Sequence, residues 1–386
     1  MNSKSTSDTS SSEQIYVVAC GHLFHDLFTS FLPPILPTLI ENLSLSLTSV
    51  GIITTFARIP SLLNPFIGYF ADKSGAKYFV ILSPAITASL MSMLGLTPNI
   101  YSLALVLFFA GLSSTMFHAA SPGLVASASA NRKGFGLSLF MAGGGLGRTI
   151  GPLLVVWAAA QWGLPGIYRL AILGWASSIV LYFQFKKFDL KTSKKHSLRS
   201  AIPVFKEFFI PFTLVLILRS TLTASLNTYL PIYMVQSGAP LWMAGAALST
   251  LEFSGVIGAL LIGPLSDTFG RRKSINLSML ISAITLPCFL RVSGWLVIPF
   301  LVILGFFSLS TSTLFLALVQ DHFQNHRATG NSVYLLISLL SNALMLIVVG
   351  YIGDHSGLKT AYLISSAAAL LSIPALRLIP VVKSNE

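Results

Sequence analysis

Twelve apolar stretches, each long enough to cross a lipid bilayer, constrain the fold of this 386-residue chain. A membrane-crossing helix needs about 20 mainly apolar residues. The stretches lie at 15–38, 48–70, 78–96, 100–124, 134–157, 165–186, 209–235, 241–266, 274–292, 295–319, 329–350 and 358–380. Because lipid offers the backbone no hydrogen-bond partner, each stretch must satisfy its own amides. The sequence therefore predicts an all-α integral membrane protein with two groups of six spans.

The charged residues support a membrane location and set an orientation. They make up only 9% of the chain, although the net charge is +12, whereas about 25% is usual in soluble domains. The basic residues lie in short loops, so the charge indicates contact with a lipid bilayer and not with nucleic acid. If the N-terminus is inside, the outside segments between the spans contain only three basic residues, Arg169, Arg291 and Lys359. By the positive-inside rule, both termini are expected in the cytoplasm.

The spans and loops give the expected domain organisation. A polar tail is followed by a six-helix bundle, a basic cytoplasmic linker, a second six-helix bundle and a short cytoplasmic tail. These parts cover residues 1–14, 15–186, 187–208, 209–380 and 381–386. The first tail is rich in serine and threonine, and we expect it to be disordered. Two bundles around one central path need only one chain, so a functional monomer is expected.

No sequence pattern indicates an enzyme or a bound cofactor. Cys20 and Cys288 both lie in apolar runs and are interpreted as packed hydrophobic residues. The chain has no metal-ligand spacing, no nucleophile motif and no phosphate-binding loop. We therefore expect neither catalytic residues, nor a metal, nor direct use of ATP. A membrane enzyme and a receptor that does not transport are the alternative classes of protein.

A polar loop occurs twice, after the second span of each half. The first copy has Gly68, Asp72, Gly75 and Lys77; the second has Gly263, Asp267, Gly270, Arg271 and Arg272. The glycines permit tight turns and close helices, and the acid and base residues are suited to pairing. We interpret both copies as parts of a cytoplasmic gate. The two copies resemble the loop motif of the major facilitator superfamily, which implies two parallel six-helix bundles and alternating access.

Ionisable residues lie within several spans. They are His22, His25, Asp26, Arg58, His118, Arg148, Arg219 and Glu252. A charge at the bilayer centre costs about 2.5–3.5 kcal/mol on insertion scales, so it normally faces a cavity or a partner. Spans three, six, nine and twelve have none at mid-depth. That spacing is expected if every third helix faces lipid.

The mid-span arginines outnumber the acids. There are three arginines, Arg58, Arg148 and Arg219, and two acids, Asp26 and Glu252. Because guanidinium matches the geometry of carboxylate and phosphonate, we expect a small anionic substrate. The alternative is internal pairing of Asp26 with Arg58 or Arg148, and of Glu252 with Arg219.

Proton binding is expected at His22 and Asp26, which lie four residues apart on one helix face. Histidine titrates near neutral pH, so such a pair is suited to taking up and releasing a proton. A hydrogen-bonded packing pair is the alternative, and Glu252 is the rival proton carrier. In span seven, Arg219, Thr223 and Asn227 form a polar stripe, so Asn227 is also a candidate substrate contact.

Several stretches resemble one subfamily, the fosmidomycin resistance transporters. They include GHLFHDLF from Gly21, GLSSTMFHAASPGLVA from Gly111 and GLSLFMAGGGLGRTIGPLL from Gly136. His22, Asp26, His118, Gly144 and Pro152 match that pattern. The resemblance implies a bacterial inner-membrane exporter, driven by protons, for a small phosphonate. The leading hypothesis is therefore export of an anion; import of an anionic metabolite, nutrient or siderophore-like chelate is the alternative.

Overall fold

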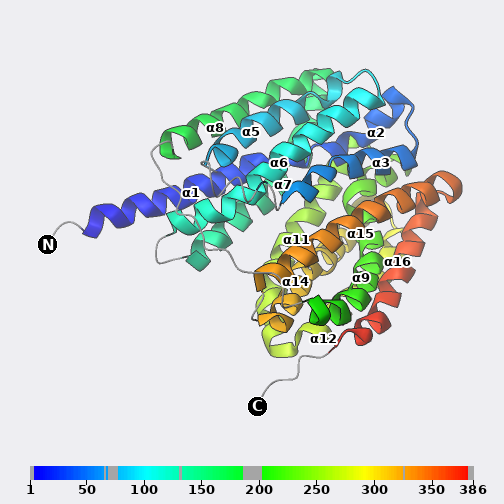
Figure 1. Ribbon diagram of the computed structural model, residues 1–386. Coiled ribbons are helices and arrows are strands. Elements are labelled where there is room, and N and C mark those ends of the chain that lie inside the picture. The colour runs from blue at the N-terminus through cyan, green and yellow to red at the C-terminus, as the bar shows by residue number, and fades with distance from the viewer. Residues whose placement is uncertain are drawn as a thin grey trace, which may run out of the picture. The chain divides into compact units, whose positions relative to one another are not determined.

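The structure is a computed structural model that describes residues 4–64, 67, 77–129, 133–185, 202–324 and 327–380. Throughout these residues the regular structure is helical (Figure 1). The chain divides into two compact units. Unit 1 comprises Met1–Leu45 and Phe56–Lys194, and unit 2 comprises Ser46–Thr55 and Lys195–Glu386.

Unit 1 is built on five long helices that enclose an apolar core. Its elements are α1 (Lys4–Thr29), α2 (Leu32–Leu43), η1 (Ile59–Leu63), α5 (Lys77–Ser92), η2 (Leu94–Leu96), α6 (Ile100–Ala128), α7 (Lys133–Trp162), η3 (Pro165–Leu170) and α8 (Ala171–Phe185). The helices α1, α5 and α8 lie side by side (Figure 1). Val18, Val80, Phe117, Phe140 and Leu181 are buried where the five long helices meet. This core positions the polar residues of α1, α6 and α7.

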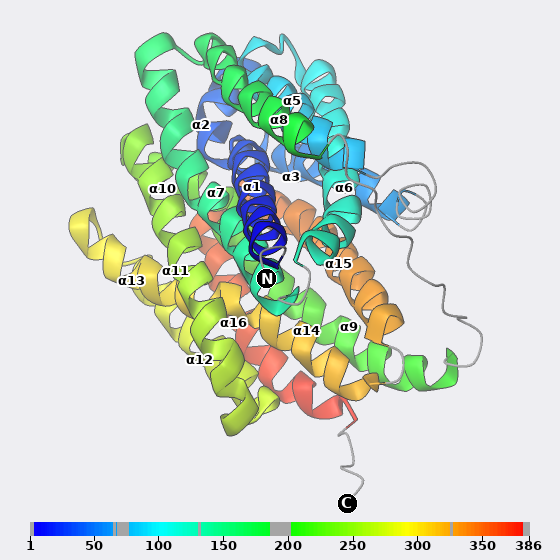
Figure 2. The same ribbon diagram turned by 90° about the vertical axis from the view of Figure 1, so that its left-hand side faces the viewer.

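Unit 2 contains the second half of the chain and one helix from the first half. Its elements are α3 (Leu47–Phe56), α9 (Ile202–Ala224), η4 (Ser225–Tyr229), α10 (Leu230–Gln236), α11 (Leu241–Phe269), α12 (Arg271–Phe289), η5 (Gly294–Leu296), α13 (Val297–Leu304), η6 (Gly305–Leu309), α14 (Ser310–His322), α15 (Arg327–Ser356), α16 (Leu358–Ala375) and η8 (Leu376–Leu378). Figure 2 shows α9, α12, α14 and α16 running alongside one another. The elements η4 and η6 are π-helical, a form that is often found at functional positions.

The described helices agree with the predicted spans. Ten of them are long and apolar enough to cross a membrane. The second predicted span corresponds to a shorter apolar stretch, Leu47–Leu63. The ninth corresponds to α12, which begins with three basic residues. Each predicted span therefore has a helical counterpart.

The polar N-terminal segment differs from expectation. Helix α1 begins at Lys4, so most of the tail expected to be disordered is helical. The segment contains no glycine or proline before the first span. Because helix propagation is easy once a long helix exists, the span extends backward through these polar residues.

Proline divides the first span into two helices. Helix α1 ends at Thr29, and α2 begins at Leu32 with a proline in its first turn. A proline lacks the amide that would continue the helix and clashes with the preceding turn. The division separates the polar section of the span, around Asp26, from its apolar end.

Glycines allow α7 to lie against the backbone of α1. A Cβ atom at Gly143, Gly147 or Gly151 would collide with a carbonyl group of α1. These residues recur every four positions and so share one helix face. Small residues of this kind allow close approach of helices in lipid. The same approach brings Arg148 of α7 next to Asp26 of α1.

Helix α3 is held against α15 within unit 2. A Cβ at Gly51 would lie 2.5 Å from the Leu346 carbonyl oxygen, so the two backbones touch. The amides of Leu47 and Thr48 donate to the Asp354 carboxylate at 2.7 and 2.8 Å. These amides have no partner within their own helix. A residue of α15 therefore caps the first turn of α3.

We expect Asp354→Ala to destabilise the protein by about 1 kcal/mol, the usual value for a lost N-terminal cap. Thermal unfolding of the purified chain in detergent measures this as a lower apparent Tm. Asp354→Asn is the matched control, since its amide oxygen still accepts one hydrogen bond and should retain part of the Tm. Equal Tm values for the parent and the alanine variant would contradict this capping role.

Candidate functional site

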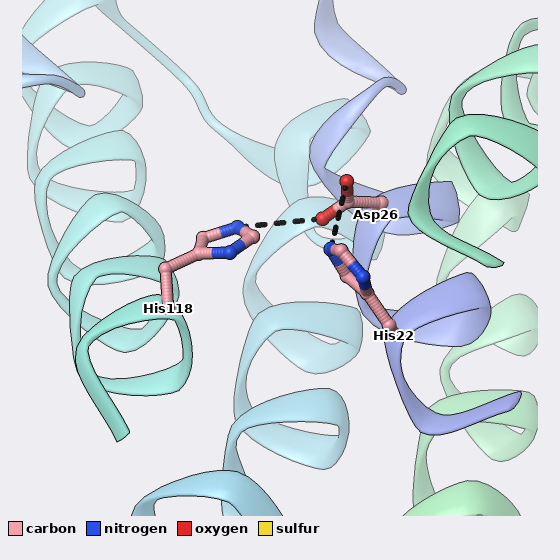
Figure 3. A group of neighbouring side chains, drawn as sticks. All are labelled: His22, Asp26 and His118. Atoms are coloured by element: carbon pink, nitrogen blue, oxygen red, sulfur yellow. Dashed lines mark ion pairs between the residues drawn. The ribbon is translucent and has the colours of Figure 1, made fainter. Parts of the chain in front are cut away.

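Asp26 is the centre of a polar cluster inside unit 1. Arg148 Nη1 donates a hydrogen bond to Asp26 Oδ2 at 2.7 Å. His22 Nε2 lies 3.3 Å from the same oxygen, and His118 Nε2 lies 3.5 Å from Oδ1. Figure 3 shows both histidines directed at the carboxylate from α1 and α6. Three basic side chains from three helices thus contact one carboxylate.

The backbone fixes the tautomer of His22. Its Nδ1 lies 2.7 Å from the Phe140 carbonyl oxygen, which can only accept, so Nδ1 carries a hydrogen. In neutral His22 the other nitrogen, Nε2, would then point a lone pair at the Asp26 carboxylate. Two acceptors repel at 3.3 Å. A proton on His22 Nε2 or on Asp26 removes the repulsion, so the geometry is suited to binding one proton.

Aromatic rings hold the two histidines of α1 in place. The His22 ring stacks on Phe140, with centroids 3.9 Å apart. The His25 ring stacks on Phe117 at 4.1 Å, and its Nε2 is 3.3 Å from Ser114 Oγ. His25 is therefore held by other contacts than those of Asp26, as the angle between successive helix positions predicts.

The cluster has a buried part and an exposed part. The side chains of His22 and Asp26 are 3% and 4% exposed, whereas those of His118 and Arg148 are 44% and 41% exposed. The imidazole of His118 and the guanidinium of Arg148 form the exposed side of the cluster, and the His22–Asp26 pair lies behind them.

The cluster also has donor atoms that a metal could use. The ligand atoms of His22, Asp26 and His118 all lie within 4.8 Å of one another. However, Arg148 holds a permanent positive charge against the same carboxylate. This charge opposes a dication and favours an anion. The donor set therefore fits a metal ion poorly.

The structure selects one of the two pairings predicted for Asp26. Its partner is Arg148. Arg58 lies at the start of η1, half-buried, and is not part of the Asp26 cluster. The second span is interrupted between α3 and η1, so Arg58 lies at a break in the helix and not on a continuous face.

The candidate residues of unit 2 lie on α9, η4 and α11. Arg219 is buried and donates to the hydroxyls of Thr311 and Ser312 on α14. The predicted Glu252–Arg219 pair is absent from the contacts of Arg219 within the described residues. Asn227 lies in η4, and its buried Oδ1 accepts no hydrogen bond from the described part of the chain. Glu252 is half-buried on α11.

The first copy of the loop motif falls largely outside the described residues. Gly68, Asp72 and Gly75 lie in the undescribed segment 68–76, while Lys77 begins α5.

The second copy of the motif is described completely and forms an ion-pair network. Arg271 pairs with Asp267 and, at 3.1 Å, with Asp321 of α14. Gly270, at φ +91°, separates α11 from α12, a backbone conformation suited to glycine. Arg272 donates to the carbonyls of Ile379 and Pro380 at 2.7 and 2.6 Å. The network joins three helices and the end of the last span.

Sequence reasoning missed the residues that act through apolar or backbone groups. Phe140 orients His22 through its carbonyl, and Phe117 supports His25. An apolar residue in a span carries no signal that separates such a role from lipid contact. Asp321 was missed for another reason: it lies at the end of a span, where an acid is unremarkable in sequence.

Comparisons with known proteins agree with this architecture. The model of the Major Facilitator Superfamily matches residues 18–259 and 243–386. The Fosmidomycin resistance protein of Escherichia coli (strain K12) is 25% identical over 366 residues, covering 92% of this chain and 90% of that protein. Multidrug resistance protein MdtG of Citrobacter koseri is 23% identical over 273 residues, covering 67% of each.

Solved structures give the same fold at low sequence identity. A bacterial homologue of the human lysosomal transporter Spinster, inward-facing and unoccupied, superposes with a TM-score of 0.76 at 15% identity, covering 97% of this chain and 99% of that one. The nucleoside transporter NupG gives a TM-score of 0.76 at 14% identity, covering 95% of this chain and 99% of that one. The predicted fold of two parallel six-helix bundles is confirmed. The chain is a multi-pass membrane protein and not an enzyme, and it belongs to the Major Facilitator Superfamily of transporters.

Proposed function

We propose that this transporter exports a small anionic compound, of phosphonate or carboxylate type, by proton-coupled alternating access. The observation behind the anion-binding and proton-coupling parts of the proposal is the Asp26 cluster. Its buried pair, His22–Asp26, lies behind two exposed basic groups, His118 and Arg148. The resistance proteins among the relatives support export of a drug-like compound.

The coupling follows from the charges of the cluster. With both histidines neutral, Asp26 and Arg148 cancel each other, and the cluster has no net charge. A proton on His22 or Asp26 makes the cluster positive. Protonation of Asp26 also weakens its hold on Arg148, whose guanidinium then turns to other acceptors. Glu252 is retained as the rival proton carrier, since it too lies within a span.

Import by proton symport is the second candidate function, and the same pair supports it. Because the proton adds positive charge, it strengthens the binding of an anion at Arg148 and His118. Proton and anion then travel together, and the inward proton gradient drives import. Exchange requires the opposite sign, in which protonation weakens substrate binding. The charge of the cluster by itself favours the sign of symport, and the proposal of export rests on the resistance proteins among the relatives. The two functions differ in a measurable quantity, the effect of pH on substrate affinity.

The remaining parts of the proposal concern the whole chain. We place it in the bacterial inner membrane as a functional monomer with both termini in the cytoplasm. The bundles at 15–186 and 209–380 then move around the linker 187–208, and the two loop motifs form the cytoplasmic gate. The ion pairs of Arg271 with Asp267 and Asp321 support this role, since ion pairs between helices are expected to weaken when a bundle moves.

Fosmidomycin tolerance tests the direction of transport. We expect a fosmidomycin-sensitive bacterium that expresses the chain to become more tolerant, because export lowers the internal concentration. The inhibitory concentration is compared with cells carrying an empty vector. Unchanged tolerance, with the protein present in the membrane, would reject this substrate for export; greater sensitivity would indicate import.

Substrate affinity at acidic and alkaline pH then decides the coupling. Exchange predicts that fosmidomycin binds the purified protein more weakly at acidic pH, whereas symport predicts tighter binding. A coupling free energy of about 1–3 kcal/mol corresponds to a change in Kd of about 5–150-fold. Isothermal titration at both pH values measures it, and a Kd independent of pH would contradict proton coupling at this cluster.

A further inference from the structure

Arg219 is a buried cation in unit 2 whose neighbours are uncharged. Its side chain projects from α9 toward α14 and is 5% exposed. Nε donates to Thr311 Oγ1 at 2.7 Å, and Nη2 donates to Ser312 Oγ. The guanidinium carbon lies 5.7 Å from the centre of the Phe315 ring. These groups orient the guanidinium without neutralising it.

The hydroxyl groups around Arg219 have their own fixed roles. Thr311 Oγ1 donates to the Ser308 carbonyl at 2.5 Å, so it can only accept from Arg219. Tyr334 donates to the Ser312 carbonyl at 3.1 Å and ties α15 to the same turn of α14. Hydrogen bonds within α14 and from α15 therefore hold these groups in place. No carboxylate pairs with Arg219 in the part of the chain that the structure describes.

A buried charge without a counter-ion is energetically costly. Taking an ion out of water costs several kcal/mol, which hydroxyl dipoles recover only in part. Within a membrane such residues face a pathway or a partner. The Asp26 cluster of unit 1 already contains the acid that offsets its arginine. Arg219 has no equivalent acid among the described residues, so an external anion is the counter-ion that fits.

We propose that Arg219, with Ser312, forms an anion-binding site of unit 2 that receives a carboxylate or phosphonate group. The inference rests on the proposed function only in taking that anion to be part of the transported compound. Nη1 and the second hydrogen of Nη2, for which the described residues provide no acceptor, offer two parallel N–H donors that match the two oxygens of such a group.

Two amide groups near the polar stripe of Arg219, Thr223 and Asn227 indicate which other groups a ligand would carry. Asn342 Nδ2 donates to Thr223 Oγ1 at 3.2 Å. Asn342 Oδ1 and Asn227 Oδ1 are buried acceptors without a hydrogen bond in the described residues. Each oxygen is an uncharged acceptor with which a donor group of a ligand can pair. The site therefore suits a compound that has hydroxyl or N–H donors beside its anionic group.

A purely structural arginine would behave differently from an anion site. If Arg219 served only to join α9 and α14, its replacement would remove two hydrogen bonds and destabilise the protein. If Arg219 binds an anion, then in the absence of that anion a neutral replacement removes a buried charge that has no counter-ion. We therefore expect Arg219→Gln to unfold, without added anion, at an apparent Tm equal to or above that of the parent.

The test is thermal unfolding of the purified full chain in detergent, with and without methylphosphonate, against chloride at equal ionic strength. We expect methylphosphonate to raise the apparent Tm of the parent by about 2–4 °C at saturation. The increase should disappear in Arg219→Gln and persist in part in Arg219→Lys. Arg291→Gln, which removes an exposed arginine of the same unit, should retain the full increase.

Three results would overturn the inference. The first is no stabilisation of the parent by methylphosphonate beyond chloride. The second is an equal increase in the parent and in Arg219→Gln. The third is an increase that Arg148→Ala removes and Arg219→Gln keeps, because the anion then binds in unit 1. None of these measurements uses a proton gradient, so the inference can fail while proton-coupled transport is upheld.

Discussion

Asp26→Asn is expected to uncouple transport from the proton gradient and to reduce gradient-driven accumulation of fosmidomycin by about 5–150-fold, the usual range for coupling between two sites. Asparagine has the shape of aspartate and still offers one oxygen to Arg148. It cannot be protonated or carry a negative charge in the physiological range. The His22–Asp26 proton site is thereby lost, while the contact that positions Arg148 is kept in part.

Proteoliposomes with an imposed pH gradient measure this effect directly. The variant should still exchange labelled for unlabelled fosmidomycin without a gradient, because exchange needs binding and alternating access but no net proton movement. This separates lost coupling from lost folding.

Glu252→Gln is the matched control, since it neutralises the second of the two mid-span acids, Asp26 and Glu252. We expect Glu252→Gln to remain coupled to the gradient. Normal coupling in Asp26→Asn together with lost coupling in Glu252→Gln would assign the proton to Glu252 and refute the present assignment.

Gly144→Ala is expected to impair transport although it changes no polar group. A Cβ at this position would lie 2.5 Å from His22 Nε2 and 2.9 Å from Asp26 Oδ2. Either distance is too short, so the added methyl group must separate the two side chains or push α7 away from α1. Overpacking of this kind costs about 1–3 kcal/mol. Gly144 is thus a positioning residue for the His22–Asp26 contact.

The expected result for Gly144→Ala is a fall in gradient-driven transport of about 5–150-fold, with a changed dependence of transport on pH. A residue important only for packing would lower the amount of folded protein and leave the pH profile alone. Gly123→Ala is the control, because a Cβ there meets no atom of the described residues within 4 Å. Parent-like transport and an unchanged pH profile in Gly144→Ala would show that the site tolerates the methyl group.

The sequence alone determined the membrane architecture. A helix that crosses lipid must be apolar over about 20 residues and must satisfy its own backbone, so the spans can be recognised without tertiary contacts. The same logic identified the polar residues of the cluster, because His22, Asp26, His118 and Arg148 are costly within a span and therefore conspicuous.

Only the tertiary structure decided which of these residues meet. Arg58 and Arg148 were equal partners for Asp26 by sequence, and the glycines that bring α7 against α1 selected Arg148. The tautomer of His22 depends on the Phe140 carbonyl, a group that every residue possesses. Arg219 proved to have neutral partners although an acid was available in sequence. Burial cost is a property of each residue and its span, so the sequence reveals it. Pairing depends on how helices far apart in the chain pack together, and only the folded chain fixes it.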